Sequence, residues 1–236
     1  MFRLFLTVIG AGLLVGGALM LVRSDPAEEL QKAQYQARIR VLVPLVEKGD
    51  FAAQLELANL YRAGLGIQPN PRKAFELYSR AAENGNATAR HALGSMFENG
   101  EGVTRDVYKA ARWYRLAAMR GNSPQSEFAL ANLYYSGRGV RQDYSEAKAY
   151  YLKAARNGHP AAQYIIGGMY ADGWGGQRDL IEAYAWYSLA ITKAAEAMAV
   201  NVDFDPAAAR ASLAKQMTRF DIGRAEQKVR AWTKGR

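Results

Sequence analysis

One phrase occurs four times in this chain, and it limits the folds that the chain can adopt. In each copy Leu or Ile is followed four residues later by an aromatic residue and then by a Gly-x-Gly pair, over residues 57–66, 93–102, 130–139 and 166–175. The first glycine of the pair, at positions 64, 100, 137 and 173, recurs after 36, 37 and 36 residues. A period of this length is typical of stacked supersecondary units. We therefore predict a repeat array with an extended surface and no deep central pit.

Each unit is predicted to contain two helices joined by the glycine pair. Ala53, Leu57, Leu60 and Tyr61 are spaced at i, i+4, i+7 and i+8, which places them on one face of a first helix, helix A. Glycine readily takes the left-handed conformation that ends many helices, so the pair predicts a sharp turn. A second helix, helix B, is expected to begin at an N-cap residue found in every unit: Asn70, Asp106, Asp143 and Asp179.

Helix B carries small and aromatic residues that we expect in the core. Alanines let two helices approach closely, and aromatic pairs fill the remaining space. The expected core positions are Ala74, Leu77, Tyr78, Ala81 and Ala82, then Ala110, Trp113, Tyr114, Ala117 and Ala118, then Ala147, Tyr150, Tyr151, Ala154 and Ala155, and finally Ala183, Trp186, Tyr187 and Ala190. The predicted fold is all-α, a right-handed α-solenoid of antiparallel helix pairs.

This pattern resembles the Sel1-like repeat, a relative of the tetratricopeptide repeat. Unit two carries the fullest version, with Ala89, Leu93, Gly94, Phe97, Gly100, Gly102, Val103, Asp106, Ala110, Trp113, Tyr114, Ala117, Ala118 and Gly121. The resemblance covers residues 49–193 and implies four units at 49–84, 85–120, 121–157 and 158–193. Unit four departs from the pattern because Ala194 replaces its closing glycine, so we expect its helix B to continue through residues 193–199.

Both ends of the array are expected to be capped. Residues 24–48 are interpreted as a linker and an N-terminal capping helix that Pro44 kinks or restarts. Residues 194–236 are interpreted as a C-terminal helical cap, with Asp205 as an N-cap. Its closing stretch resembles that of many bacterial Sel1-like proteins, and Ile222, Ala225, Val229 and Trp232 recur there at helical spacing.

The amino-terminal segment is predicted to enter a membrane. Residues 4–22 contain 19 positions without a charge between Arg3 and Arg23, enough for a helix to span roughly the 30 Å of a bilayer core. We interpret residues 1–23 as an uncleaved transmembrane anchor, with a cleaved signal peptide as the alternative. Placing the repeats in the periplasm, on the inner membrane, follows partly from family precedent. The absence of cysteine excludes disulfides and thiolate chemistry.

The composition argues against catalysis. The two histidines, His91 and His159, lie in different units, and no triad, paired-carboxylate or metalloprotease motif occurs. The Gly-x-Gly pairs follow predicted helices, whereas dinucleotide-binding fingerprints follow strands. We therefore predict no enzyme activity, no cofactor and no metal. The net charge of +9 is expected on a solvated outer face, with an anionic lipid surface or an acidic partner as alternatives and nucleic acid not expected.

The resemblance implies an adaptor for protein partners in the cell envelope, and helix A offers the surface. Positions about 140° to 160° from Leu57 face away from the core, and in the tetratricopeptide architecture this face lines a concave groove. The predicted partner-binding residues are Leu55, Asn59, Arg62, His91, Ser95, Glu98, Phe128, Asn132, Tyr135 and Tyr164. The same residues could instead pack on the next helix A. The alternatives for function are a glycan-binding factor, with Tyr135 and Tyr164 stacking on sugars, and a Sel1-family hydrolase.

Overall fold

The computed structural model describes residues 25–120, 123–174 and 176–234, and within them the chain is all-α. An N-terminal helix, α1 (Pro26–Glu47), precedes four helix pairs. The A helices are α2 (Phe51–Ala63), α4 (Ala87–Asn99), α6 (Pro124–Ser136) and α8 (Pro160–Asp172). The B helices are α3 (Pro71–Glu83), α5 (Val107–Arg120), α7 (Tyr144–Arg156) and α9 (Leu180–Ile191). Three further helices follow: α10 (Ala194–Val200), α11 (Pro206–Ala214) and α12 (Arg219–Lys234).

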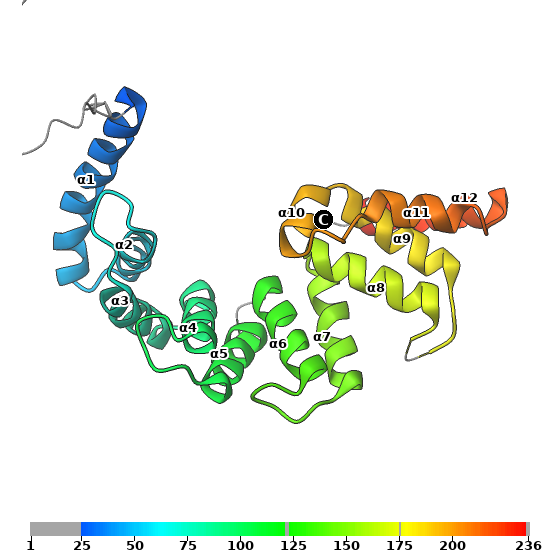
Figure 1. Ribbon diagram of the computed structural model, residues 1–236, viewed down its shortest axis with the longest axis horizontal. Coiled ribbons are helices and arrows are strands. Elements are labelled where there is room, and N and C mark those ends of the chain that lie inside the picture. Colours follow the sequence, from blue (N-terminus) through cyan, green and yellow to red (C-terminus); the bar gives the residue numbers. More distant parts are fainter. Residues whose placement is uncertain (1–24, 121–122, 175, 235–236) are drawn as a thin grey trace, which may run out of the picture.

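The helices stack into an open arch (Figure 1). From α1 to α9 each helix packs mainly on its neighbours in the chain, which is the contact pattern of a solenoid. Helices α2, α4 and α6 lie on the inner side of the arch, and α3, α5 and α7 lie outside them. The predicted repeat solenoid and its helix pairs are therefore confirmed, and the inner surface is built from A helices.

The A-to-B turns explain how tightly the units stack. The first glycine of each pair ends helix A in the left-handed conformation, with φ of 70° at Gly64 and 74° at Gly100. The second glycine reaches the preceding unit: a side chain on Gly102 would place its Cβ 2.6 Å from the Pro71 carbonyl carbon, and one on Gly139 would lie 2.4 Å from the Val107 carbonyl oxygen. Only glycine fits at these two contacts, because both the backbone angle and the space exclude a side chain.

Helix α1 occupies the place of a helix B before the first unit. A Cβ on Gly66 would lie 2.5 Å from Tyr35 of α1, which matches the way that Gly102 meets α3. Tyr35 and Ile39 pack against the same core cluster as Leu57. The N-terminal helix therefore completes the inter-unit contact that unit one would otherwise lack.

The N-caps of the B helices are as predicted. The side chains of Asn70 and Asp106 accept from the backbone N–H of Lys73 and Lys109, at 3.0 and 2.9 Å. Asp143 and Asp179 cap α7 and α9 in the same way. Each cap satisfies amide groups that the first helical turn leaves without an intrahelical partner.

The predicted core is largely confirmed. All eleven of the helix B alanines expected there are buried, and Tyr78, Tyr114, Tyr151 and Tyr187 are buried beside them. Trp113 and Tyr150 are only partly buried. Gly94 explains one close approach, because a Cβ there would lie 2.5 Å from the ring of Tyr114.

Two expectations about helix boundaries need correction. Pro44 does not restart α1, which runs unbroken from Pro26 to Glu47 with the proline in its last turn, where it removes one backbone N–H from the helix. Helix α9 does not continue through residues 193–199. It ends at Ile191, where the Thr192 hydroxyl donates to the Leu189 carbonyl at 2.7 Å and the Lys193 N–H donates to the Ala190 carbonyl at 3.2 Å, and α10 then begins at Ala194.

The C-terminal helices cover the last unit. Helices α11 and α12 pack on α9, and α10 packs on α8. Asp205 caps α11 as predicted, and Leu213 and Ala225 are buried against Tyr184 and Ala185 of α9.

The predicted transmembrane segment, residues 1–23, lies outside the described residues. Across the described ranges, no helix combines the length and apolar character that crossing a membrane requires.

The glycine contact gives a first prediction. Gly139→Ala should lower the free energy of unfolding by roughly 2–4 kcal/mol, because it adds a left-handed penalty and a clash with the Val107 backbone. Gly223→Ala is the matched control, since its Cβ would meet nothing within 4 Å and helix propensity should raise stability by about 0.5–1 kcal/mol. Urea denaturation followed by circular dichroism measures both. Equal stability of the Gly139→Ala variant and the parent would contradict the packing role of this turn.

Candidate partner-binding surface

The helix A residues predicted to bind a partner differ in solvent exposure. Asn59, Asn132 and Tyr135 are exposed, whereas Phe128 is buried with 9% of its surface accessible. The partly buried members are Leu55, Arg62, His91, Ser95, Glu98 and Tyr164. The inner face is thus less open than the helical spacing alone predicts, because each unit lies against the next.

Polar members of this set connect successive units. The Arg62 guanidinium donates to both carboxylate oxygens of Glu101, at 2.7 to 2.9 Å, and to the Ser95 hydroxyl at 3.0 Å. Arg138 of unit three donates to Glu98 of unit two at 3.1 Å. These ion pairs hold neighbouring units in register, so the three inner charges Arg62, Glu98 and Glu101 already have partners within the chain.

His91 and Phe128 stand at the same position of helix A in units two and three, and each contacts the next unit. His91 Nδ1 lies 2.9 Å from the Ser126 hydroxyl of the next helix A. Phe128 stacks on His159, with ring centroids 4.2 Å apart and planes within 11°. The side chain of Phe128 therefore supports the groove from beneath and does not present a surface to a ligand.

Tyr164 is covered in a different way. Its ring stacks on Phe204 at 4.6 Å, and its hydroxyl donates to the Asp203 carbonyl at 3.4 Å. Both partners belong to the segment that follows α10, the short helix that packs on α8. The C-terminal segment thus covers the inner face of unit four at the position where the sequence predicts an accessible tyrosine.

The two asparagines keep their polar groups at the surface. Asn59 and Asn132 each accept, through the side-chain oxygen, from a buried tyrosine hydroxyl of the same unit, Tyr78 at 2.6 Å and Tyr151 at 2.5 Å. The amide group of each exposed asparagine thereby has a fixed orientation. A fixed donor of this kind suits the backbone carbonyl of an extended peptide.

Three aromatic side chains form a partly exposed cluster, the aromatic ridge, defined by Tyr135, Tyr144 and Trp174. The ring centroids lie 5.5 Å (Tyr135 and Tyr144), 5.9 Å (Tyr135 and Trp174) and 5.6 Å (Tyr144 and Trp174) apart. Tyr135 and Tyr144 are 49% and 51% exposed. The ridge lies at the turn edge of the arch, since Tyr135 is near the end of α6, Tyr144 opens α7, and Trp174 follows α8.

A hollow lies on each side of Trp174. The larger, of about 650 Å³, is lined by Tyr135, Tyr151, Ile165, Met169, Asp172 and Trp174. The smaller, of about 440 Å³, is lined by Tyr144, Ser145, Lys148, Leu152 and Trp174. Lys148 donates to the Trp174 carbonyl at 3.1 Å and so fixes the backbone of the turn. One hollow carries an acidic residue and the other a basic residue beside shared aromatic walls.

Tyr144 and Trp174 are functional candidates that the sequence reasoning missed. Trp174 occupies the middle position of the Gly-x-Gly pair, where the other units have Leu65, Glu101 and Arg138. A tryptophan at a turn position that otherwise varies is the signal that could have pointed to it. The contact with Tyr135 spans two units and depends on the stacking of the units.

Two basic residues of unit two have partners within that unit. Lys109 pairs with Asp106 at 3.4 Å, and Arg105 donates to the Glu98 carbonyl at 2.9 Å.

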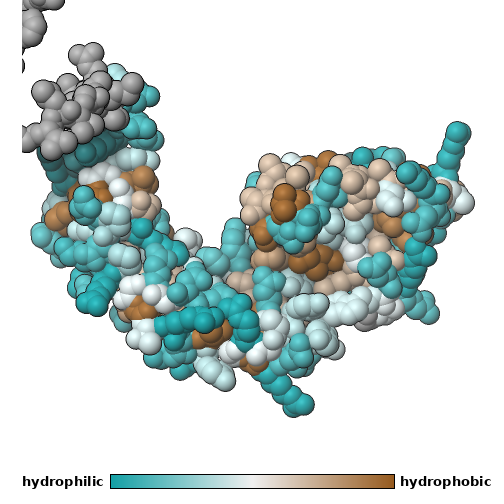
Figure 2. All heavy atoms as spheres, viewed as in Figure 1, coloured by the Kyte–Doolittle hydropathy of each residue, from teal (hydrophilic) through white to brown (hydrophobic). Residues whose placement is uncertain are grey.

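Figure 2 shows a mainly hydrophilic surface over the N-terminal half, whereas apolar atoms gather over the C-terminal half around α10. On this face the C-terminal half is therefore more hydrophobic than the N-terminal half.

The two histidines have structural surroundings. Burial lowers the pKa of His91 and of His159 to about 4, so both rings are neutral near pH 7. His159 uses Nδ1 to accept from the Ala162 N–H at 3.3 Å as the N-cap of α8. Over the residues whose placement is described, no three His, Cys, Asp or Glu side chains gather as metal ligands would.

Comparison with known proteins identifies the repeats. Residues 51–86, 87–122, 124–159 and 160–194 each match the Sel1 repeat. This chain belongs to the Sel1 repeat family. Proteins built from Sel1 repeats typically mediate protein–protein interactions and are generally non-catalytic. The assignment agrees with the helix pairs, glycine turns and buried alanines described above.

The chain is also similar to several solved structures. A Sel1 repeat protein from Oxalobacter formigenes is 34% identical with a TM-score of 0.61, and the match covers 70% of this chain and 68% of that protein. Cysteine rich protein B from Helicobacter pylori is 28% identical with a TM-score of 0.46, over 57% of this chain and 96% of that protein. An immunity protein from Pseudomonas aeruginosa is 24% identical with a TM-score of 0.46, over 74% and 69%. The comparison with curated proteins finds no match.

The histidines give a prediction on pH. Because the pKa of His159 is depressed in the folded state, the unfolded chain binds more protons between about pH 6.5 and 4, and stability should fall as the pH falls through that window. His159→Asn keeps an N-cap of the kind that Asn86 provides for α4 but does not titrate. The variant should lose roughly 1–2 kcal/mol less than the parent between pH 7.5 and 4.5 in urea titrations. Identical pH profiles would contradict this role of His159.

Proposed function

We propose that this Sel1 repeat protein is a non-catalytic adaptor of the bacterial cell envelope that binds an extended segment of a partner protein. The partner lies along the inner helix A face and over the aromatic ridge. The observation that carries the proposal is the ridge itself, with two half-exposed tyrosines and a tryptophan between two hollows. Tyr and Trp are enriched among the residues that dominate binding energy at protein interfaces.

The ridge and the fixed asparagine suit an extended polypeptide. Neighbouring side chains of such a segment could occupy the hollows on the two sides of Trp174, one beside Asp172 and the other beside Lys148. Asn132 lies on the same helix as Tyr135, three residues earlier, where its amide can hold the backbone of the segment. The aromatic contacts supply affinity, and the two opposite charges favour one direction of the partner chain.

A glycan is the less favoured ligand. Sugar recognition through Tyr135 and Tyr164 needs a free face on each ring, but Tyr164 stacks on Phe204 and lies 5.3 Å from Tyr187. No observation favours hydrolysis, since both histidines contribute to packing and capping. A protein partner therefore accounts best for the exposed groups.

A site-specific cross-linker tests the surface. A photo-reactive phenylalanine analogue at Tyr135 should give a discrete cross-linked product in the native bacterium. The same analogue at Tyr108, which is 74% exposed on the outer helix α5, should give none. Trp174→Ala should lower the yield at position 135 by about tenfold, equivalent to roughly 1.4 kcal/mol of binding energy. Equal products from both positions, or full yield with Trp174→Ala in a variant of unchanged circular dichroism, would contradict the proposal.

Residues 1–23 are proposed to anchor the protein in the inner membrane with the repeats in the periplasm. A charge-free stretch of 19 residues supports an anchor. A carboxyl-terminal alkaline phosphatase fusion should be active and should stay with the membrane fraction. An inactive fusion would place the repeats in the cytoplasm, and activity released from the membrane would indicate cleavage of the segment.

A further inference from the structure

The larger hollow beside Trp174 lies where unit four lacks a side chain that the other units have. At one equivalent position of helix A, units one and three carry Asn59 and Asn132, unit two carries Ser95, and unit four carries Gly168. Gly168 lines the hollow, which has a volume of about 650 Å³. Unit four therefore has open space where units one and three hold an amide group.

The glycine also leaves one buried hydroxyl without an acceptor side chain on helix A. In the first three units the equivalent hydroxyl of helix B donates to helix A: Tyr78 to Asn59 at 2.6 Å, Tyr114 to Glu98 at 2.9 Å and Tyr151 to Asn132 at 2.5 Å. In unit four this residue is Tyr187, which is 6% exposed, but the two helix A positions are Gly168 and Ala171. A Cβ on Gly168 would lie 3.4 Å from the Tyr187 hydroxyl. The hydroxyl is therefore beside the hollow, where a donor from a ligand can satisfy it.

An acid without a counter-ion lies at the edge of the same hollow. Asp172 is the last residue of α8 and lines the hollow. Across the described residues no cation forms an ion pair with its carboxylate. The C-terminal end of a helix carries partial negative charge, so an acid there is unfavourable and a cation is favourable. A bound cation would relieve this repulsion.

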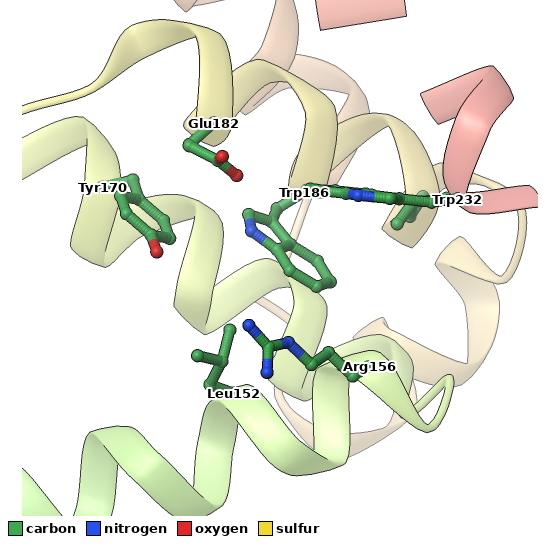
Figure 3. A pocket seen from close by; sticks show the side chains of 7 residues that line it. Leu152, Arg156, Tyr170, Glu182, Trp186 and Trp232 are labelled. Atoms are coloured by element: carbon green, nitrogen blue, oxygen red, sulfur yellow. The ribbon is translucent and has the colours of Figure 1, made fainter. Parts of the chain in front are cut away.

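Other acids beside the pockets and on the inner face are already paired. Glu182 lines a smaller pocket at the junction of the last unit and α12 (Figure 3), and its carboxylate pairs with Lys228. On the inner face Glu98 pairs with Arg138 at 3.1 Å. Asp172 differs from these acids because its charge remains for a ligand.

Two basic side chains of the neighbouring backbone have other partners. Lys148 donates to the Trp174 carbonyl at 3.1 Å. Arg178 donates to the Ala171 carbonyl and to the Gln216 side chain, both at 2.7 Å. Both cations hold the segments around the hollow, and neither pairs with the carboxylate at its edge.

The walls of the hollow suit both parts of a long basic side chain. Ile165 and Met169 supply apolar surface, on which a hydrocarbon stem can lie. Tyr135 and Trp174 supply aromatic rings with centroids 5.9 Å apart, and the faces of such rings attract cations. The head group can donate to the carboxylate and to the tyrosine hydroxyl, which both accept hydrogen bonds.

We propose that the larger hollow binds the side chain of an arginine or a lysine of the partner segment, with its charged head group between Asp172 and the rings of Tyr135 and Trp174. The inference rests on the proposed function, because the segment that lies over the aromatic ridge supplies this side chain. It adds the chemistry of the partner. Since the whole chain has a net charge of +9, the rest of the segment is expected to be neutral or acidic around this basic residue.

Indole signals of the full-length chain in mild detergent test this pairing. The chain has four tryptophans, so ¹⁵N-tryptophan labelling gives four indole signals, and Trp174→Phe assigns the one of interest. The probe is a capped pentapeptide with one arginine between alanines, and its matched control carries neutral citrulline instead. The arginine peptide should shift the Trp174 signal saturably, with a dissociation constant between about 0.1 and 5 mM. The citrulline peptide should bind at least about fivefold more weakly.

Two variants assign the contacts. Asp172→Asn should weaken binding of the arginine peptide by about fivefold or more and remove its preference over citrulline, whereas Glu76→Gln, at an exposed acid of α3, should change neither. Gly168→Asn gives unit four the asparagine of units one and three. It should fill the hollow and weaken binding by about tenfold, with folding checked by circular dichroism.

The outcomes separate this inference from the proposed function. A lysine peptide that binds as tightly as the arginine peptide would identify an ammonium as a suitable head group, and weaker binding would select the guanidinium. No saturable shift up to about 10 mM, equal affinity for arginine and citrulline, or an unchanged preference in Asp172→Asn would overturn the inference. The cross-link at position 135 would persist in that case if the proposed function holds, and its loss would count against the proposed function itself.

Discussion

The stacking of this protein depends on one contact, the approach of each A-to-B turn to the helix B of the preceding unit. At Gly102 and Gly139 the turn lies so near Pro71 and Val107 that a Cβ would overlap their backbone. The contact sets how far apart successive units can be, and the spacing between units determines which side chains meet across them. The inner ion pairs, the stack of Phe128 on His159 and the aromatic ridge all require it.

A buried polar position on helix A adds a second link between units. The fourth residues of the A helices are Gln54, Arg90, Glu127 and Gln163, and all four are buried. Arg90 and Gln163 donate to the carbonyls of Ala82 and Ala155 near the end of the preceding helix B, at 3.2 and 3.1 Å. Each carbonyl also accepts from a backbone N–H just after its helix, Gly85 or Gly158, so the side chains add a second hydrogen bond at the helix ends.

In unit three a different side chain donates to the carbonyl near the end of the preceding helix B. Glu127 cannot donate a hydrogen bond as a carboxylate, and Lys153 of α7 donates instead to the Ala118 carbonyl at 2.8 Å. The ammonium of Lys153 also lies 3.1 Å from Glu127, and Asn157 donates to the other carboxylate oxygen at 2.8 Å. A buried acid is tolerated here because it has a cation and a donor beside it. The sequence reasoning did not single out this position, since polar residues on a helix are ordinarily expected at the surface.

The sequence by itself determined the elements of this protein. The period of the glycine pairs, the N-cap residues and the alanines of helix B are local signals, and each acts within its own unit, so the helix pairs and their core follow without knowledge of the fold. The inner face was harder to predict. Helical spacing shows which way Phe128, Tyr135 and Tyr164 point, but only the tertiary structure decides whether another element lies there. His159 covers Phe128, the segment after α10 covers Tyr164, and Tyr135 alone of these three stays open and meets Trp174 from the next unit, because exposure is a property of the stacked array and not of a single helix.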